Sequence, residues 1–308
     1  MIEAAALTKR YGSTTAVDGL SFTVPPGQVT GFLGPNGAGK STTMRLILGL
    51  DAPTSGAVTI GGRPYASYRR PLTVAGAMLE ARAFHGGRSA RSHLLCLADS
   101  NGISAARVDQ VLDLVGLRSA ARKRAGGFSL GMGQRLGIAA ALLGDPPVLM
   151  LDEPVNGLDP EGVAWIRALL KSLAAEGRAI LLSSHLMSEM ALTADRLVII
   201  GRGRLITQAA MDEFLAGDGG AVRARSPQAA QLAAALRARG ATVAGADGDT
   251  LTITGITSEA VGEAARAAGL ALTELSARQA SLEDRYMQLT QDSADYRSTA
   301  GPFAPAGK

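Results

Sequence analysis

The sequence predicts an α/β fold in which a mostly parallel sheet is flanked by helices. Short aliphatic runs alternate along the chain with longer segments of three-and-four apolar spacing, and a glycine-rich loop joins one such run to the helix that follows it. The 308 residues allow one large or two ordinary domains, and a hydrophobic content of 46% is sufficient for a packed core. In such folds ligands bind at the carboxyl ends of the strands, which is where we look for functional residues.

The predicted elements of the first part of the chain follow from periodicity and from turn residues. Residues 1–30 alternate as strands do, with a turn at Pro25-Pro26-Gly27. Apolar runs and helical spacing then predict a strand at 29–33, a helix at 42–50, a strand at 57–60, helices within 88–117, a helix at 129–143, a strand at 148–151, a helix at 162–175 and a strand at 179–182. We assign residues 1–216 to this domain, with a helical subdomain at about 80–140.

A second, smaller domain is predicted after the glycine-rich segment 217–220, which has the composition of a linker. The expected order is a strand at 221–225, a helix at 227–239, a hairpin turning at Asp247-Gly248, a helix at 258–268, a strand at 270–275 and a helix at 281–289. This β-α-β-β-α-β order predicts a ferredoxin-like α+β domain over residues 221–291. It has no titratable cluster, which favours a structural or regulatory role over a second active site. Residues 292–308 are predicted to be disordered.

The formal charge of +4 suits anionic ligands or a membrane face, although it is also common among enzymes. The basic cluster at 118–124 has no interleaved aromatic residues, so we expect a solvated charged face and no nucleic-acid partner. The single cysteine, Cys96, excludes an internal disulfide and is expected to be a small core residue.

Membrane insertion is not expected. The first residues lack a signal pattern, and no apolar run reaches the roughly 18 to 20 residues that a span requires. If the protein works at a membrane, a second chain must cross it.

The most informative segment is Gly34-Pro35-Asn36-Gly37-Ala38-Gly39-Lys40-Ser41, which lies between the predicted strand at 29–33 and the predicted helix at 42–50. This is the spacing of a phosphate-binding loop, in which glycines let consecutive N–H groups point at phosphate oxygens. Lys40 offers a positive charge to the β- and γ-phosphates, and the hydroxyl of Ser41 is a ligand for Mg²⁺. The motif predicts a P-loop fold and binding of a nucleoside triphosphate.

Further polar residues follow two other strands. The aliphatic run 148–151 leads directly into Asp152 and Glu153, so that Asp152 can hold a Mg²⁺ shell and Glu153 can polarise an attacking water. The run Leu181-Leu182-Ser183-Ser184 delivers His185 to the same edge of the sheet, where an imidazole could touch the γ-phosphate.

The segment 128–135 precedes the carboxylate strand. Ser129 is a suitable N-cap, and Gly131 leaves backbone N–H groups open at the start of a helix. By itself this pattern indicates only a capped helix.

In this order, the motifs resemble those of the nucleotide-binding subunits of ABC transporters over roughly residues 1–215. Residues 34–41 resemble the Walker A loop, residues 148–153 the Walker B strand and residues 129–134 the signature segment. Residues 157–159 resemble the D-loop, His185 the switch histidine, and Tyr11 stands where the family stacks an aromatic ring on adenine. The nearest likeness is to drug exporter ATPases of the daunorubicin- and bacitracin-resistance type.

Two positions depart from the family pattern. Glu80 stands where the Q-loop glutamine is expected, and its anionic side chain changes the local charge balance. The signature reads Ser129-Leu130-Gly131-Met132, so Ser129 and Gly131 are present, but Met132 cannot donate the amide hydrogen bonds of a glutamine.

The resemblance implies an ATPase that drives a separate membrane permease, exporting a drug, antibiotic or lipid-like substrate at the cytoplasmic face of the membrane. It implies ATP and Mg²⁺ as cofactors and a head-to-tail homodimer that sandwiches each ATP. The implied catalytic residues are Glu153, His185 and Lys40; the implied metal ligands are Ser41, Asp152 and Glu80; the implied nucleotide contacts are Tyr11, Gly34, Pro35, Asn36, Gly37, Ala38, Gly39, Lys40, Ser41, Thr42, Ser129, Gly131, Met132 and Asp159. The alternatives are an ABC-type ATPase acting on ribosomes or DNA, and a regulatory ATP binder with weak turnover.

Overall fold

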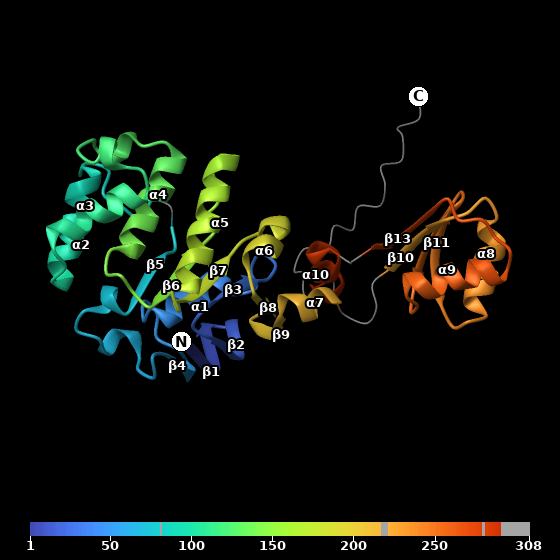
Figure 1. Ribbon diagram of the computed structural model, residues 1–308. Helices are drawn as coiled ribbons and strands as arrows, with labels where there is room; N and C mark the ends of the chain where they lie inside the picture. The colour runs from blue at the N-terminus through green and yellow to red at the C-terminus, as the bar shows by residue number, and fades with distance from the viewer. Residues whose placement is uncertain (81, 217–220, 279–280, 291–308) are drawn as a thin grey trace, which may run out of the picture. The chain divides into compact units, whose positions relative to one another are not determined.

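The computed structural model describes residues 1–80, 82–216, 221–278 and 281–290 (Figure 1). Contacts between residues divide this part of the chain into two compact units, Met1–Ala209 and Ala210–Gln288, with the last described residues, 289 and 290, grouped with the first. The predicted linker at 217–220 and the predicted disordered tail at 292–308 lie outside the described residues.

The first unit is built on a six-stranded sheet, which confirms the predicted α/β fold. Its strands follow the order β5 (Ala75–Met78), β6 (Val148–Asp152), β7 (Ala179–Ser183), β3 (Gln28–Leu33), β8 (Arg196–Gly201) and β9 (Arg204–Ala210). All pairs from β5 to β8 are parallel. Because the aliphatic strands β6 and β7 are adjacent, with Asp152 opposite Ser183, the polar residues that follow them are brought to one edge.

A three-stranded antiparallel sheet covers one side of this sheet. It is formed by β2 (Thr14–Val24), β1 (Ile2–Tyr11) and β4 (Ser55–Ile60), so the strands predicted within residues 1–30 and at 57–60 are confirmed. Helix α1 (Lys40–Ile47) packs against β2 and β4. The shared core includes Phe22 and Phe32, whose rings stack at 5.5 Å between centroids. This core fixes the phosphate loop between the two sheets.

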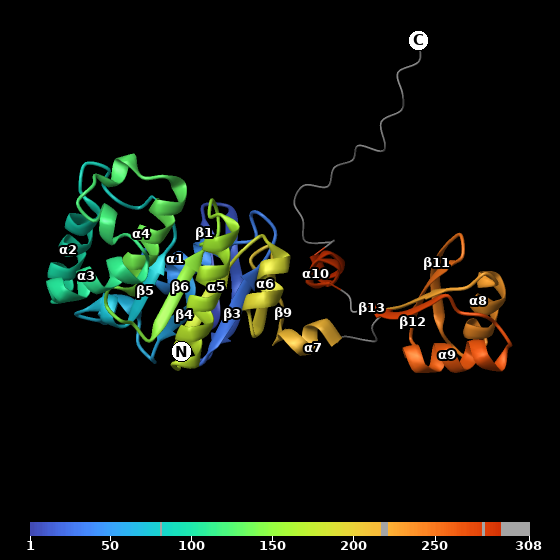
Figure 2. The ribbon, with the colours of Figure 1, turned by 45° about the horizontal axis from the view of Figure 1, so that its top comes forward.

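Helices α5 (Pro160–Ala175) and α6 (Met187–Thr193) pack together, and α5 lies against β3 and β7 (Figure 2). Gly31 of β3 lets α6 approach closely, because a Cβ at this position would lie only 2.5 Å from the sulfur of Met190. The short helix α6 is therefore anchored directly on the sheet, just after the segment that carries His185.

Three helices pack together beyond β5: α2 (Ala90–Asn101), α3 (Ala105–Leu114) and α4 (Leu130–Leu142) (Figure 1). Each begins at a serine whose side chain accepts a hydrogen bond from a backbone N–H three residues on: Ser89, Ser104 and Ser129. The placement of Cys96 in the core was wrong: α2 buries Leu94 and Ala98, one turn apart, and leaves Cys96 exposed. Short 3₁₀ turns complete the unit at Tyr65–Ser67, Pro71–Thr73, Arg118–Ala120 and Ala125–Gly127.

The second unit contains the predicted β-α-β-β-α-β order. Its strands are β10 (Ala221–Arg225), β11 (Thr242–Asp247), β12 (Thr250–Thr254) and β13 (Glu274–Arg278), and its helices are α7 (Met211–Ala216), α8 (Ala229–Arg237), α9 (Ser258–Ala267) and α10 (Leu282–Thr290). The sheet order β11-β12-β10-β13, with every pair antiparallel, is that of a ferredoxin-like domain.

Two details of the second unit differ from the prediction. The hairpin turns at Gly248-Asp249, one residue later than predicted, because Gly248 takes the left-handed conformation with φ of 63°. The last strand begins at Glu274 and not at residue 270, because Leu270 and Leu272 pack against the core from a connecting segment. Within the described ranges, no helix of either unit has both the length and the apolar character to cross a bilayer.

Thr30, in the middle of β3, provides a stability prediction. Its side chain is fully buried, and its hydroxyl has no hydrogen-bond partner among the described residues. A buried hydroxyl without a partner costs stability, so we expect the isosteric change Thr30→Val to raise the free energy of unfolding by about 1 kcal/mol. Urea denaturation of the two proteins measures this difference. A lower midpoint for Thr30→Val would show that the hydroxyl has a partner in solution.

Candidate functional site

The glycine-rich loop connects β3 to α1 and folds as tightly as its sequence requires. Gly37 and Gly39 have φ of 82° and 98°. A Cβ at Gly34 would lie 2.6 Å from the carbonyl oxygen of Ile200, and one at Gly39 would lie 2.4 Å from that of Ala16. Larger residues are therefore excluded at these positions. The loop borders an open cavity of about 340 Å³, lined by Ala16, Asn36, Gly37, Ala38, Gly39, Lys40, Ser41, Thr42, Asp152 and Glu153.

Lys40 begins α1 and folds back over the loop. Its ammonium donates hydrogen bonds to the carbonyl oxygens of Gly34, at 2.6 Å, and Pro35, at 3.2 Å. Burial lowers the pKa of Lys40, and the charges of Glu153 and Asp152 partly offset this shift. The Lys40 ammonium is therefore a partly desolvated positive charge next to the cavity, which makes it a suitable partner for phosphate oxygens.

The structure brings the two carboxylates and the histidine to the same edge. The hydroxyl of Ser41 donates to Asp152 Oδ2 at 3.1 Å. His185 follows β7, and its Nδ1 lies 2.8 Å from Glu153 Oε2. Lys40, Ser41, Asp152, Glu153 and His185 therefore form one connected group at the carboxyl ends of β3, β6 and β7.

The oxygen donors at this edge fit a magnesium ion. Mg²⁺ prefers oxygen ligands and is bound in triphosphate sites by one or two protein groups together with substrate phosphates and waters. Ser41 Oγ and Asp152 Oδ2 are oxygen atoms of this kind and lie next to each other beside the phosphate loop. In the described part of the chain no group of three or more histidine, cysteine, aspartate or glutamate side chains could hold a metal by itself.

Glu80 stands apart from this group. It follows β5, which pairs in parallel with β6, so it lies at the same edge of the sheet, but it does not line the phosphate-loop cavity. Its side chain is exposed. The third predicted metal ligand is therefore near the site and not in contact with Ser41 or Asp152 in the described contacts.

The predicted signature residues form the start of α4. Ser129 Oγ accepts a hydrogen bond from the backbone N–H of Met132 at 3.2 Å. The helix start packs on the segment after the carboxylates, because a Cβ at Gly157 would lie 2.1 Å from Leu130 Cδ2. Ser129, Gly131 and Met132 do not line the phosphate-loop cavity of their own chain.

Two other residues that were predicted to contact the nucleotide, Asp159 and Tyr11, make hydrogen bonds within the chain. Asp159 caps α5 by accepting a hydrogen bond from the N–H of Gly162 at 2.8 Å. The hydroxyl of Tyr11 donates to Asp51 at 2.9 Å, and the ammonium of Lys9 lies 4.8 Å from the centre of the Tyr11 ring. Tyr11 is 47% exposed and does not line the cavity.

Two buried residues that contact the predicted carboxylate residues were given no role in the sequence analysis. Ser183 is fully buried and bonds to both Asp152 and Glu153. Gln134, also buried, donates to the carbonyl oxygens of Glu153, at 3.3 Å, and Asn156, at 2.9 Å. The available signal was polarity, since Ser183 ends an otherwise apolar strand and Gln134 lies in a helix whose residues, Arg135 apart, are otherwise apolar.

Comparison with known proteins decides the family. A family model described as "ABC transporter" matches residues 17–156, and a second, "Domain of unknown function (DUF8746)", matches residues 220–283. The bacitracin transport ATP-binding protein BcrA of Bacillus licheniformis is 45% identical over 217 residues, which are 70% of this chain and 71% of that protein. The chain belongs to the ABC transporter ATP-binding family.

Other ABC proteins support the assignment. The lantibiotic transport ATP-binding protein SrtF of Streptococcus pyogenes is 37% identical over 69% of this chain and 92% of its own length. A solved ATP-binding subunit of an ABC transporter has a TM-score of 0.64 and 29% identity, covering 70% of this chain and 91% of that one. The family resemblance inferred from the motifs and the ABC fold are therefore confirmed, as is the use of ATP.

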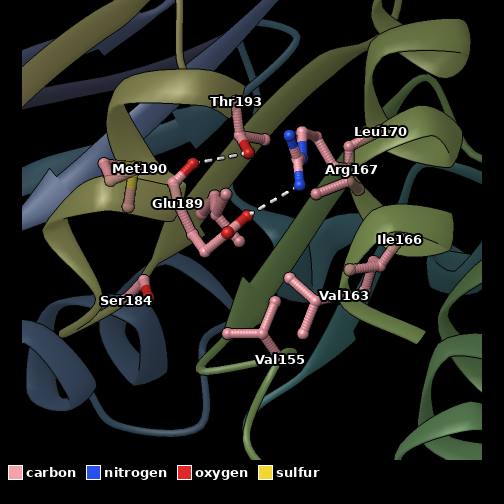
Figure 3. Close-up of a pocket in the computed structure, with 10 residues that line it drawn as sticks. Val155, Val163, Ile166, Arg167, Leu170, Ser184, Glu189, Met190 and Thr193 are labelled. Carbon is pink, nitrogen blue, oxygen red and sulfur yellow. Dashed lines mark hydrogen bonds and ion pairs between the residues drawn. The ribbon is translucent and has the colours of Figure 1, made fainter. Parts of the chain in front are cut away.

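A second cavity lies between α5, α6 and the end of β7 (Figure 3). Arg167 and Glu189 pair across it at 3.3 Å, and the Thr193 hydroxyl donates to the carbonyl oxygen of Glu189 at 2.7 Å. The remaining lining residues are Val155, Val163, Ile166, Leu170, Leu182, Ser184 and Met190. Its volume of about 10 Å³ is too small for more than one water, so it is a packing gap and not a ligand site.

Proposed function

We propose that this chain is the ATP-hydrolysing subunit of an ABC transporter and drives export of a drug, antibiotic or lipid-like substrate through a separate membrane permease. The observation that carries the proposal is the group formed by the phosphate loop, Lys40, Ser41, Asp152, Glu153 and His185 at one edge of the sheet. The export role is supported by the relatives, whose names include bacitracin and lantibiotic transport. The chain would work at the cytoplasmic face of the membrane, bound to its permease.

The proposed roles follow from the contacts. The N–H groups of residues 36–42 and the ammonium of Lys40 bind the phosphates, with Lys40 exchanging its bonds to Gly34 and Pro35 for phosphate oxygens. Ser41 and Asp152 would hold Mg²⁺, which offsets charge on the phosphates. Glu153 orients a water and takes its proton, and His185, held by Glu153 Oε2, contacts the γ-phosphate.

A second copy of the chain completes each site in this proposal. The start of α4, with Ser129 and Gly131, has open N–H groups and does not line the cavity of its own chain. Two copies arranged head to tail would place each helix start on the nucleotide of the other. The backbone N–H of Met132 is already donated to Ser129 Oγ, and its side chain cannot donate a hydrogen bond, so Met132 is proposed to contact the nucleotide only through apolar atoms. Tyr11 is proposed to stack on the adenine, Glu80 to contact Mg²⁺ through a water, and Asp159 to contact the nucleotide.

Co-purification with the permease and an ATPase measurement test the function. We expect the full chain to pull down an integral membrane protein, to release phosphate from ATP and to be stimulated when the pair is reconstituted with the transported compound. Bacitracin and lantibiotics are the first compounds to try, since transport proteins for these are among the relatives. Phosphate release no faster than that of Glu153→Gln would contradict the proposal.

A further inference from the structure

Ser183, the last residue of β7, connects the two carboxylate residues of the site. Its side chain is fully buried, and β7 pairs with β6 so that Ser183 lies directly opposite Asp152. The Ser183 hydroxyl donates to Asp152 Oδ1, and it accepts a hydrogen bond from the N–H of Glu153 at 3.0 Å. One buried hydroxyl therefore contacts both residues that follow the aliphatic part of β6.

The direction of both hydrogen bonds is determined by the partners. A hydroxyl has one proton to donate and two lone pairs to accept with. The N–H of Glu153 can only donate, and a carboxylate can only accept. The Ser183 proton must therefore point at Asp152 Oδ1, and its lone pair at Glu153. With Oδ1 held in this way, Oδ2 of Asp152 is directed at the hydroxyl of Ser41, 3.1 Å away.

Glu153 needs this support because its backbone is strained. Its φ of 51° lies in the left-handed region, which residues other than glycine rarely adopt and which persists only where the surroundings hold it. The N–H of Glu153 donates to both Oγ and, at 3.3 Å, the carbonyl oxygen of Ser183. Gln134 donates to the carbonyl oxygen of Glu153 from the other side. The conformation directs the Glu153 carboxylate to the cavity and to His185.

We propose that Ser183 is a positioning residue for ATP hydrolysis: it holds Asp152 toward Ser41 and holds Glu153 in its left-handed conformation. This proposal rests on the proposed ATPase function. Ser183 touches neither the cavity nor the reacting atoms, so it acts only through its two neighbours.

Replacement of Ser183 by alanine separates positioning from binding. In the full chain we expect Ser183→Ala to lower kcat by about 10- to 100-fold and to raise the Mg²⁺ concentration needed for half-maximal activity, as is usual when a partner of a metal ligand is removed. The affinity for ATP in EDTA should stay within about twofold of wild type, because the phosphate-loop contacts are unchanged. A merely structural role would lower the midpoint of unfolding without this split.

A binding measurement that does not depend on ATP hydrolysis, together with two further variants, completes the test. Calorimetry of ATP binding with and without Mg²⁺ should show a smaller gain from Mg²⁺ in Ser183→Ala than in wild type. Ser183→Cys, with a weaker donor of similar size, should lie between them and replaces Ser183→Ala if that variant does not fold. Thr30→Val removes a buried hydroxyl from the neighbouring strand and should leave kcat and the Mg²⁺ dependence unchanged.

The outcomes distinguish failure of the positioning role of Ser183 from failure of the proposed ATPase function. If wild type hydrolyses ATP and folded Ser183→Ala keeps both kcat and the Mg²⁺ dependence within about twofold, the positioning role is overturned while the ATPase function stands. If wild type releases phosphate no faster than Glu153→Gln, the proposed function fails. The calorimetric comparison then still decides whether Ser183 positions Asp152.

Discussion

Glu153→Gln is expected to abolish most ATP turnover while leaving ATP binding intact. The amide has the size of the carboxylate but cannot take a proton from water, and loss of a general base lowers kcat by about 10²- to 10⁴-fold. The phosphate contacts of Lys40 and the loop are not altered by the change. We therefore expect ATP to hold two copies of Glu153→Gln together, as a dimer that persists during gel filtration in ATP and Mg²⁺.

The measurements are phosphate release, ATP affinity by calorimetry and the mass of the ATP-bound species. Glu176→Gln is the matched control, because Glu176 is a surface residue paired with Arg178, and loss of such a pair has little effect. Phosphate release by Glu153→Gln close to the wild-type rate would contradict the assigned role. If Glu153→Gln loses turnover but remains a monomer in ATP, the role of Glu153 as the general base stands and the ATP-held dimer is excluded.

The elements that the sequence analysis predicted have a strong local signal, although β8, with the aliphatic run Leu197-Val198-Ile199-Ile200, has one too and was not predicted. The aliphatic run 148–151 and the capped helix after Ser129 were predicted within a residue or two. Strand β5 was missed because Ala75–Met78 has only four residues, two of them alanine and one glycine, and small residues carry no strand signal. It is a strand because β6 lies beside it. Its conformation therefore depends on pairing with β6, which the local sequence does not reveal.

Some residues of the site could likewise be placed from the sequence, and others could not. Gly34–Ser41, Asp152, Glu153 and His185 could be placed from sequence because motif spacing and strand ends bring them to one edge. The contacts of Ser183 could not be placed from sequence, because they depend on the parallel register that sets it opposite Asp152. The left-handed conformation of Glu153 is likewise a property of the folded chain, held by contacts from β7 and α4.

Lys40→Ala is expected to weaken ATP binding about 10- to 100-fold, as removal of a hydrogen bond to a charged group costs about 1.5–3 kcal/mol. In the structure the Lys40 ammonium is held over the loop by the carbonyl oxygens of Gly34 and Pro35, so it is already placed for a phosphate. Fluorescent-nucleotide titration or calorimetry in EDTA measures the change. Lys171→Ala, on the exposed side of α5, is the matched control.

The pH dependence of ATP binding tests whether the positive charge of Lys40 is what contributes to the affinity for ATP. Burial lowers the pKa of Lys40 below its ordinary value of 10.5. A lysine binds phosphate when protonated, so wild-type affinity is full at low pH and falls as the pH rises through the lowered pKa. Lys40→Ala has no proton to lose there and should show a flatter profile over the same range. Equal affinities, or identical pH profiles, for the two proteins would refute the assignment of residues 34–41 as the phosphate loop.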